Sequence, residues 1–247
     1  MNIISLGAGV QSTRLALGAG EGEFGPIVAG VFADTQAEPY WVYEQLAFIE
    51  SKVSFPIYKV TAGNLAEDTL RGVNSTGQKF YPIPWRMENA LGRRQCTREY
   101  KLKPIYEKCR ELGASAKNPA NLMIGISMDE IFRAKPARVK YVKNVWPLLD
   151  KRVYRLDCLQ WMTDRGYPLP RKSACVFCPY HGNDEWRDIK TFDADGWRLA
   201  VKVDEAIRIN GVKQYAHRDL VPLEDADLSK ADQADMFNEA CEGMCGV

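Results

Sequence analysis

Short apolar runs alternate with polar and glycine-containing segments along the first two-thirds of the chain. Runs at residues 2–6, 27–33 and 121–126 are each followed by polar or glycine residues and then by a segment able to form a helix. Residues 56–60 are a candidate for a further strand. Continuous apolar runs of this length are typical of parallel strands that are buried on both faces. The pattern therefore predicts an α/β fold with a doubly wound, mostly parallel sheet.

Helical periodicity supports the same fold class. Residues 38–52 place Trp41, Leu46 and Ile49 among their apolar positions, and residues 102–112 begin near Pro104, which suits a first helical turn. The intervening stretch 63–94, rich in Gly, Asn, Thr and Pro, predicts a long loop or lid. We find no repeat and no clear linker. We therefore expect one domain over residues 1–247, with a core at about 1–150 and a cysteine-bearing C-terminal region at about 151–247.

Composition and charge limit the kinds of ligand and cellular location that we expect. The net charge is only +1, but the charges are unevenly distributed: residues 86–103 and 133–143 are basic, and residues 224–235 are acidic. Basic clusters of this kind suit polyphosphate or nucleic-acid ligands, or form a solvated helix face. No apolar stretch approaches the ~20 residues of a membrane span, and a secretory signal is not evident. Seven cysteines do not make a fully paired disulfide framework. We expect a cytoplasmic protein without membrane contact.

A glycine-containing turn follows the first predicted strand and leads into a helix. Its glycines, Gly7 and Gly9, allow close approach of the backbone to an anion, and the hydroxyls of Ser5, Ser12 and Thr13 can donate hydrogen bonds. A turn between a strand and a helix presents backbone N–H groups at a positive helix end, which favours phosphate. The turn lacks the Gly-Lys-Ser/Thr ending of a Walker A motif. A structural tight turn is the alternative interpretation.

Cysteines form the second candidate site. Cys175 and Cys178 have the two-residue spacing that brings two thiolates to one metal, to a cluster or into a redox pair. Zinc held by these two, His181 and one more cysteine is one alternative. Cys158 is either a further ligand or a small buried side chain, and Cys109 is expected in the core.

Several segments together resemble a known superfamily. Residues 5–13 are similar to the PP-loop of the ATP pyrophosphatase (adenine nucleotide alpha hydrolase-like) superfamily. Residues 33–38 and 125–133 resemble nucleotide-binding segments of its PAPS reductase branch, and residues 96–104 resemble the Cys-Cys-x-x-x-Lys-x-x-Pro run of adenylyl-sulfate reductases. The resemblance implies a Rossmann-like, HUP-type fold. It also implies that Asp34 lies near adenosine and Arg133 contacts the nucleotide.

The phosphate loop departs from the superfamily pattern. Val10 and Gln11 stand where many PP-loops carry Lys and Asp, although Gln11 remains within the expected nucleotide-binding set. The missing positive charge has four candidate replacements, namely Arg14, Arg93, Arg94 and Arg133.

The same resemblance assigns ligands to a metal centre. Cys96 becomes the third ligand beside Cys175 and Cys178, because it matches one of the paired reductase cysteines, while Thr97 replaces the other. Three cysteines holding a 4Fe–4S cluster with one open iron is the arrangement implied for tRNA-thiolating PP-loop enzymes. Zinc remains the alternative.

The resemblance implies an enzyme of sulfur metabolism similar to PAPS or adenylyl-sulfate reductase, which is an oxidoreductase; a sulfurtransferase is the alternative. In the first case Cys245 or Cys241 attacks the sulfur of PAPS or adenylyl sulfate, and a thioredoxin-like partner releases sulfite. In the second, ATP, with Mg²⁺ as a candidate companion ion, adenylates a nucleobase or nucleic acid, and sulfide replaces AMP; a cysteine desulfurase is then a candidate partner. A non-catalytic nucleotide-binding protein with structural zinc is the third possibility.

Overall fold

A five-stranded parallel sheet forms the centre of the molecule. The computed structural model describes residues 1–79, 83–208 and 213–230. The strand order is β3-β2-β1-β6-β7, with every neighbouring pair parallel. The strands are β1 (Asn2–Leu6), β2 (Ala29–Ala33), β3 (Ile57–Val60), β6 (Ala120–Ile124) and β7 (Val142–Val145). The predicted α/β class is confirmed, and four of these strands fall within a few residues of the predicted runs.

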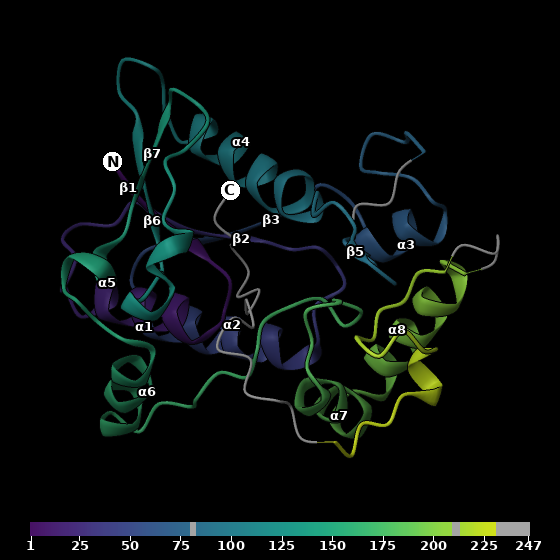
Figure 1. Ribbon diagram of the computed structural model, residues 1–247. Coiled ribbons are helices and arrows are strands. Elements are labelled where there is room, and N and C mark those ends of the chain that lie inside the picture. Colours follow the sequence, from purple (N-terminus) through teal and green to yellow (C-terminus); the bar gives the residue numbers. More distant parts are fainter. Residues whose placement is uncertain (80–82, 209–212, 231–247) are drawn as a thin grey trace.

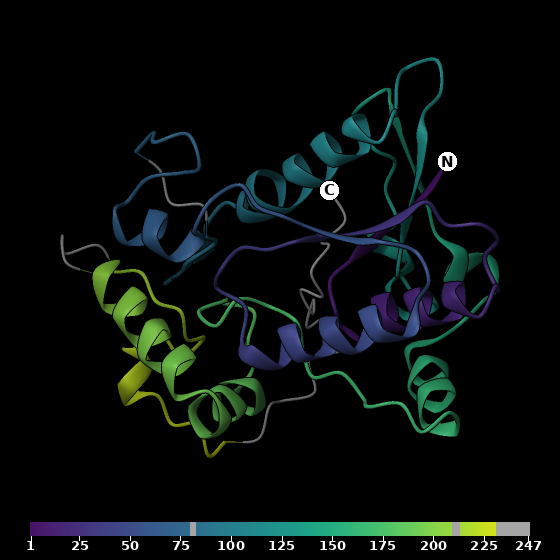
Figure 2. The ribbon, with the colours of Figure 1, turned by 180° about the vertical axis from the view of Figure 1, so that it is seen from behind.

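Helices cover both faces of the sheet, as Figures 1 and 2 show from opposite sides. One face carries α1 (Val10–Gly20) and α2 (Tyr40–Lys52), and the other carries α4 (Lys103–Glu111). Residues alternate between the faces along β1: Ile4 and Leu6 pack with α1 and α2, whereas Ile3 packs with α4. This alternation follows from the period of two along a strand.

The sheet has a topological switch point between β1 and β6. The chain proceeds outward from β1 through β2 to β3 and then returns to the other side of β1 to form β6. Loops that leave the carboxyl ends of β1 and β6 therefore diverge in opposite directions. In open α/β sheets this is where ligands bind.

A second hydrophobic core lies beyond the sheet. It joins α3 (Leu65–Leu70), α7 (Asn183–Phe192) and α8 (Ala194–Ala206) to the segment around residues 174–178, and it includes Trp85, Phe177 and Trp186. These elements lie together in both views of the ribbon (Figures 1 and 2). The stretch 63–94, predicted as a long loop, is more structured than expected: it contains α3 and the hairpin of β4 (Arg86–Met87) and β5 (Ala90–Leu91).

The remaining elements are short. They are the π-helix η1 (Thr97–Leu102), the 3₁₀ helices η2 (Met128–Arg133) and η3 (Leu223–Asp225), α5 (Pro147–Asp150) and α6 (Arg155–Asp164). Strand β7 was not predicted, because its sequence Val-Lys-Asn-Val carries too few apolar residues. No helix in the described ranges is long and apolar enough to cross a membrane.

Candidate functional site

The turn after β1 forms the N-terminal end of α1. Gly9 is the N-cap with extended backbone, and Thr13 donates its N–H to the Gly9 carbonyl at 2.9 Å. The N–H groups ahead of Thr13 belong to the first turn, which has no intrahelical acceptors. The left-handed residue of the turn is Ala8, with φ of 57°, rather than either predicted glycine. A non-glycine residue held there costs free energy and commonly marks a functional loop.

The hydroxyl groups predicted to bind phosphate have different roles. Ser12 closes the loop on itself, because its Oγ accepts from the Gly7 N–H at 3.3 Å and donates to the Gly9 carbonyl at 3.2 Å. Ser5 and Thr13 are buried, and their hydroxyl oxygens have no hydrogen-bond partner in the described part of the chain. Both hydroxyl groups are enclosed by the protein, and the phosphate contacts predicted for Ser5 and Thr13 stay a prediction.

The loop after β6 packs directly against this turn. A Cβ atom at Gly125 would lie 2.7 Å from the carbonyl carbon of Gln11 and from the nitrogen of Ser12, so only glycine fits. Gln11 then bridges the two loops: its Nε2 donates to Ser127 at 3.2 Å and to Glu130 at 3.1 Å. These two hydrogen bonds join residues 116 and 119 positions apart at the switch point.

Three of the arginines proposed to replace the PP-loop lysine, Arg14, Arg94 and Arg133, lie in different surroundings. Arg133 comes nearest, because it is buried and pairs at 2.6 Å with Glu130, which also accepts from Gln11. Arg14 is excluded: its guanidinium pairs with Glu23 at 2.8 Å and lies 3.9 Å from the centre of the Trp161 ring, over the later turns of α1. Gln11 itself receives a hydrogen bond from Arg155 at 3.0 Å.

The loop after β2 lies at the same edge of the sheet. Asp34 is held by two hydrogen bonds to its Oδ1, from the Gln36 N–H at 2.8 Å and the Tyr43 hydroxyl at 2.9 Å. Burial, and then the charge of Asp34, raise the pKa of Tyr43, so the phenol remains a donor. An oriented carboxylate at this edge suits the predicted place near adenosine.

The loop after β2 also supports the cysteine segment. Ala37 accepts the Val176 N–H at 2.8 Å, and Thr35 accepts the Leu65 N–H at 3.0 Å. Glu38 follows, with its carboxylate buried and paired to Lys101 at 3.1 Å. The loop thus links the nucleotide edge of the sheet to the second core.

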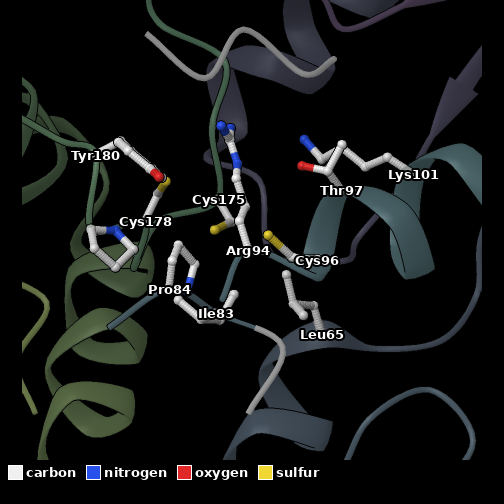
Figure 3. A pocket seen from close by; sticks show the side chains of 11 residues that line it. Leu65, Ile83, Pro84, Arg94, Cys96, Thr97, Lys101, Cys175, Cys178 and Tyr180 are labelled. Atoms are coloured by element: carbon white, nitrogen blue, oxygen red, sulfur yellow. The ribbon is translucent and has the colours of Figure 1, made fainter. Parts of the chain in front are cut away.

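The three predicted cysteine ligands line one cavity, which we call the cysteine pocket (Figure 3). Cys96 comes from the start of η1, and Cys175 and Cys178 come from the segment before α7; the sulfur atoms of Cys96 and Cys175 point into the space between them. Arg94 and Lys101 also line the pocket. Its volume of about 20 Å³ holds little more than one water molecule.

Cys175 and Cys178 form a tight turn. The Cys178 N–H donates to the Cys175 carbonyl at 2.9 Å. The side-chain hydrogen bond with Cys178 acts to lower the pKa of the Cys175 thiol, but burial and the nearby Glu38 and Cys96 outweigh it and raise the pKa. Without a bound cation the Cys175 thiol is therefore protonated near neutral pH.

The donor set fits a soft metal or an iron–sulfur cluster in kind, since three sulfur atoms share one cavity. The cavity, however, is too small for such a cluster as it stands. The side chains that line it would have to move apart to admit any group larger than a single ion. Among the residues that the structure describes, no group of three His, Cys, Asp or Glu side chains is arranged to hold a single metal ion. His181 does not line the pocket: its Nε2 contacts the Cys175 carbonyl at 2.9 Å, and its ring packs against Trp186.

Two other cysteines belong to the core. Cys158 packs with Val10, Leu148 and Met162 in a small hydrophobic cluster, so the interpretation as a fourth ligand is wrong. Cys109 is buried on the α4 face, as predicted, and burial raises its pKa to about 11. The proposed catalytic Cys241 and Cys245 lie outside the described residues.

Sequence reasoning missed two residues that shape the site. The sequence around Glu38 indicates only that this residue follows the second predicted strand. Its ion pair with Lys101 joins residues 63 positions apart, and such a pairing cannot be recognised from the sequence. Gly125 was noted only as part of a motif; a glycine at the end of a buried strand is a signal of close backbone approach.

Comparisons with known proteins find similarity in fold to solved structures. No protein-family model and no curated protein matches the chain. A solved structure, the phosphate complex of phosphoadenylyl-sulfate (PAPS) reductase from Candida auris, is similar over 68% of this chain and 74% of that one, with 13% identity and a TM-score of 0.44. The residue roles above rest on the geometry of this chain alone.

Proposed function

We propose that this chain is an adenine-nucleotide-dependent enzyme of sulfur chemistry, and that its reaction is sulfur transfer to an acceptor activated by adenylation. One observation carries the proposal. The phosphate loop after β1 and the cysteine pocket are connected through the loop after β2, whose Ala37 and Glu38 hold the cysteine segment and the helix of Cys96. The loop after β2 carries Asp34 of the expected nucleotide site and also supports the cysteine segment.

The reaction has two steps. In the first, a carbonyl oxygen of the acceptor attacks the α-phosphorus of ATP, an O–P bond forms, and pyrophosphate leaves. In the second, hydrosulfide adds to the same carbon, the C–O bond breaks, and AMP leaves with its oxygen while the carbon keeps sulfur. Adenylation is required because a carbonyl oxygen is otherwise a poor leaving group.

The described residues contribute binding and orientation. The N-terminal turn of α1 and the unpaired hydroxyls of Ser5 and Thr13 suit the phosphates. Asp34 is oriented for the adenosine, and Arg133 adds positive charge close to the loop. Cys96, Cys175 and Cys178 would hold a 4Fe–4S cluster, whose uncoordinated iron would supply a binding site for the sulfur donor. The placement of Cys158 in a separate core favours this three-cysteine arrangement.

A second candidate reaction is reductive cleavage of an adenylyl sulfate. It is favoured by Arg94, which lines the cysteine pocket and suits a sulfate anion, whereas the charge of Lys101 is compensated by Glu38. A cysteine thiolate would form an S–S bond with the sulfate sulfur, and the sulfur–oxygen bond to the nucleotide would break. A dithiol partner would then release sulfite and become a disulfide.

One experiment separates the two reactions. The protein is purified anaerobically, analysed for iron, sulfide and zinc, and divided between two assays. The first supplies ATP with bulk tRNA and measures AMP, pyrophosphate and thiolated nucleosides by mass spectrometry; the second supplies adenylyl sulfate or PAPS with thioredoxin and measures sulfite. We expect AMP and a thionucleoside. Sulfite alone would replace the proposal with the reductive reaction, and bound zinc with neither product would favour the non-catalytic alternative.

A further inference from the structure

A second, larger cavity lies on the other side of the helix that carries Cys96. It has a volume of about 340 Å³ and is bounded by η1, α4 and the segment 138–141. We call it the basic pocket, because four cationic side chains line it: Arg98, Lys103, Arg110 and Arg138. None of them belongs to the nucleotide site or to the cysteine pocket.

The charges of the basic pocket are not neutralised internally. Elsewhere arginines near the site are paired, as Arg14 is with Glu23 and Arg133 with Glu130. In the described part of the chain, by contrast, no ion pair involves any of the four cations. Glu107 is the one carboxylate among the residues lining the cavity. Four cations around one cavity repel each other, and an anionic ligand relieves that repulsion.

The walls between the cations are aromatic and apolar. Tyr106 and Tyr141 meet edge to face with ring centres 6.4 Å apart, and the Arg110 guanidinium lies 5.6 Å from the centre of the Tyr141 ring. Tyr106 is buried, whereas Tyr141 is half-buried and borders the cavity. Phosphate-binding cations around a planar, partly apolar wall suit a nucleotide unit, since bases stack on tyrosine and phosphates pair with arginine.

Two features indicate a strand rather than a free nucleotide. Exposed lysines continue the positive surface along the segment that leads into β7, at positions 135, 140 and 143. The π-helix η1 contributes to both pockets: Thr97 and Lys101 line the cysteine pocket, while Arg98 and Leu102 line the basic pocket. The two pockets therefore share η1 as a common wall.

We propose that the basic pocket binds a single-stranded nucleic-acid segment, with Arg98, Lys103, Arg110 and Arg138 on its phosphates and Tyr141 against a base. This site is separate from the adenine-nucleotide site and needs no catalysis. The binding proposal can therefore be tested without knowing which sulfur reaction the protein performs.

The test measures binding directly. Fluorescence anisotropy with labelled RNA and DNA oligonucleotides of about 12 residues gives the affinity of the full chain at several salt concentrations. The double variant Arg110→Gln/Arg138→Gln removes two cations that lie outside the nucleotide site and the cysteine pocket. We expect at least a tenfold loss of affinity and a decrease of about 1.4 in the slope of log affinity against log salt, that is, about 0.7 for each lost phosphate contact. Tyr141→Leu should weaken binding about tenfold with an unchanged salt slope.

Control measurements distinguish loss of the basic pocket from a general loss of positive charge or of the fold. Arg198→Gln, at an exposed arginine on α8, should leave affinity within twofold. ATP binding by calorimetry should be the same in the double variant as in the wild type, which also shows that the fold is intact. Equal oligonucleotide affinity in the double variant and Arg198→Gln would overturn the proposal. The proposal would also be overturned if AMP displaced the oligonucleotide when both are supplied at the same concentration of nucleotide units. The pocket would then bind a free nucleotide rather than a strand.

Discussion

Lys101 Nζ lies 3.1 Å from Glu38 Oε1, and both side chains are almost entirely buried. The pair connects the π-helix that begins after Cys96 to the loop that leaves β2. Thr35 adds a third member, since its hydroxyl donates to the same carboxylate oxygen at 3.1 Å. This ion pair therefore helps to fix the position of Cys96 relative to the carboxyl edge of the sheet.

We predict that Glu38→Gln destabilises the protein by about 3–5 kcal/mol, because it leaves the Lys101 ammonium buried without its counter-charge. Urea unfolding monitored by circular dichroism measures this change. Glu111→Gln breaks the partly exposed pair with Lys108 and should cost less than about 1 kcal/mol. Similar losses in the two variants would show that the buried pair has no special role.

Cys96→Ser, Cys175→Ser and Cys178→Ser should each abolish bound iron after anaerobic reconstitution, because each removes one of three sulfur donors from the pocket. Iron and sulfide analysis with the visible spectrum provides the measurement. Cys158→Ala and Cys109→Ala are matched controls, since both cysteines lie in other cores. Full iron content in any of the three serine variants, or its loss in a control, would contradict the ligand assignment.

Gly125→Ala should weaken ATP binding at least tenfold, because the added Cβ would stand 2.7 Å from backbone atoms of Gln11 and Ser12 and displace the phosphate loop. Isothermal calorimetry measures the affinity. Gly22→Ala is the control: its Cβ meets open space, but its positive φ makes alanine costly. That variant should lose stability while it keeps ATP affinity. Unchanged affinity in Gly125→Ala would separate the β6 loop from the nucleotide site.

Stability should fall with acid through His181. Burial lowers its pKa to about 3, against about 6.5 in the unfolded chain, so the unfolded state binds the proton first. The stabilising contribution is present above pH 6.5 and is lost progressively down to pH 3. Between pH 6.5 and 5 this amounts to about 2 kcal/mol. Urea unfolding at both pH values should show a smaller loss in His181→Gln than in the wild type; equal losses would mean that His181 takes up its proton in the folded state.

The centre of the sheet was predictable from the sequence because β1, β2 and β6 are largely buried and appear as apolar runs. Strand β7 was not predicted because it lies at the edge of the sheet, where the polar side chains of Lys143 and Asn144 are tolerated. The grouping of Cys96 with Cys175 and Cys178 was predicted from motif resemblance, and the structure brings them to one cavity. The positions of Arg14 and Cys158 were not predictable, since each depends on packing between α1 and α6.

The winding of η1 shapes the wall between the two pockets. A π-helix closes its hydrogen bonds over five residues instead of four, so Thr97–Leu102 contains one residue more than an α-helical path of the same span. The wider turn accommodates the additional residue, so Cys96 before it and α4 after it keep the relative phase of a continuous α-helix. The additional residue therefore enlarges the surface of η1 without turning its two ends against each other. Thr97 and Lys101 line the cysteine pocket with that surface, and Arg98 and Leu102 line the basic pocket.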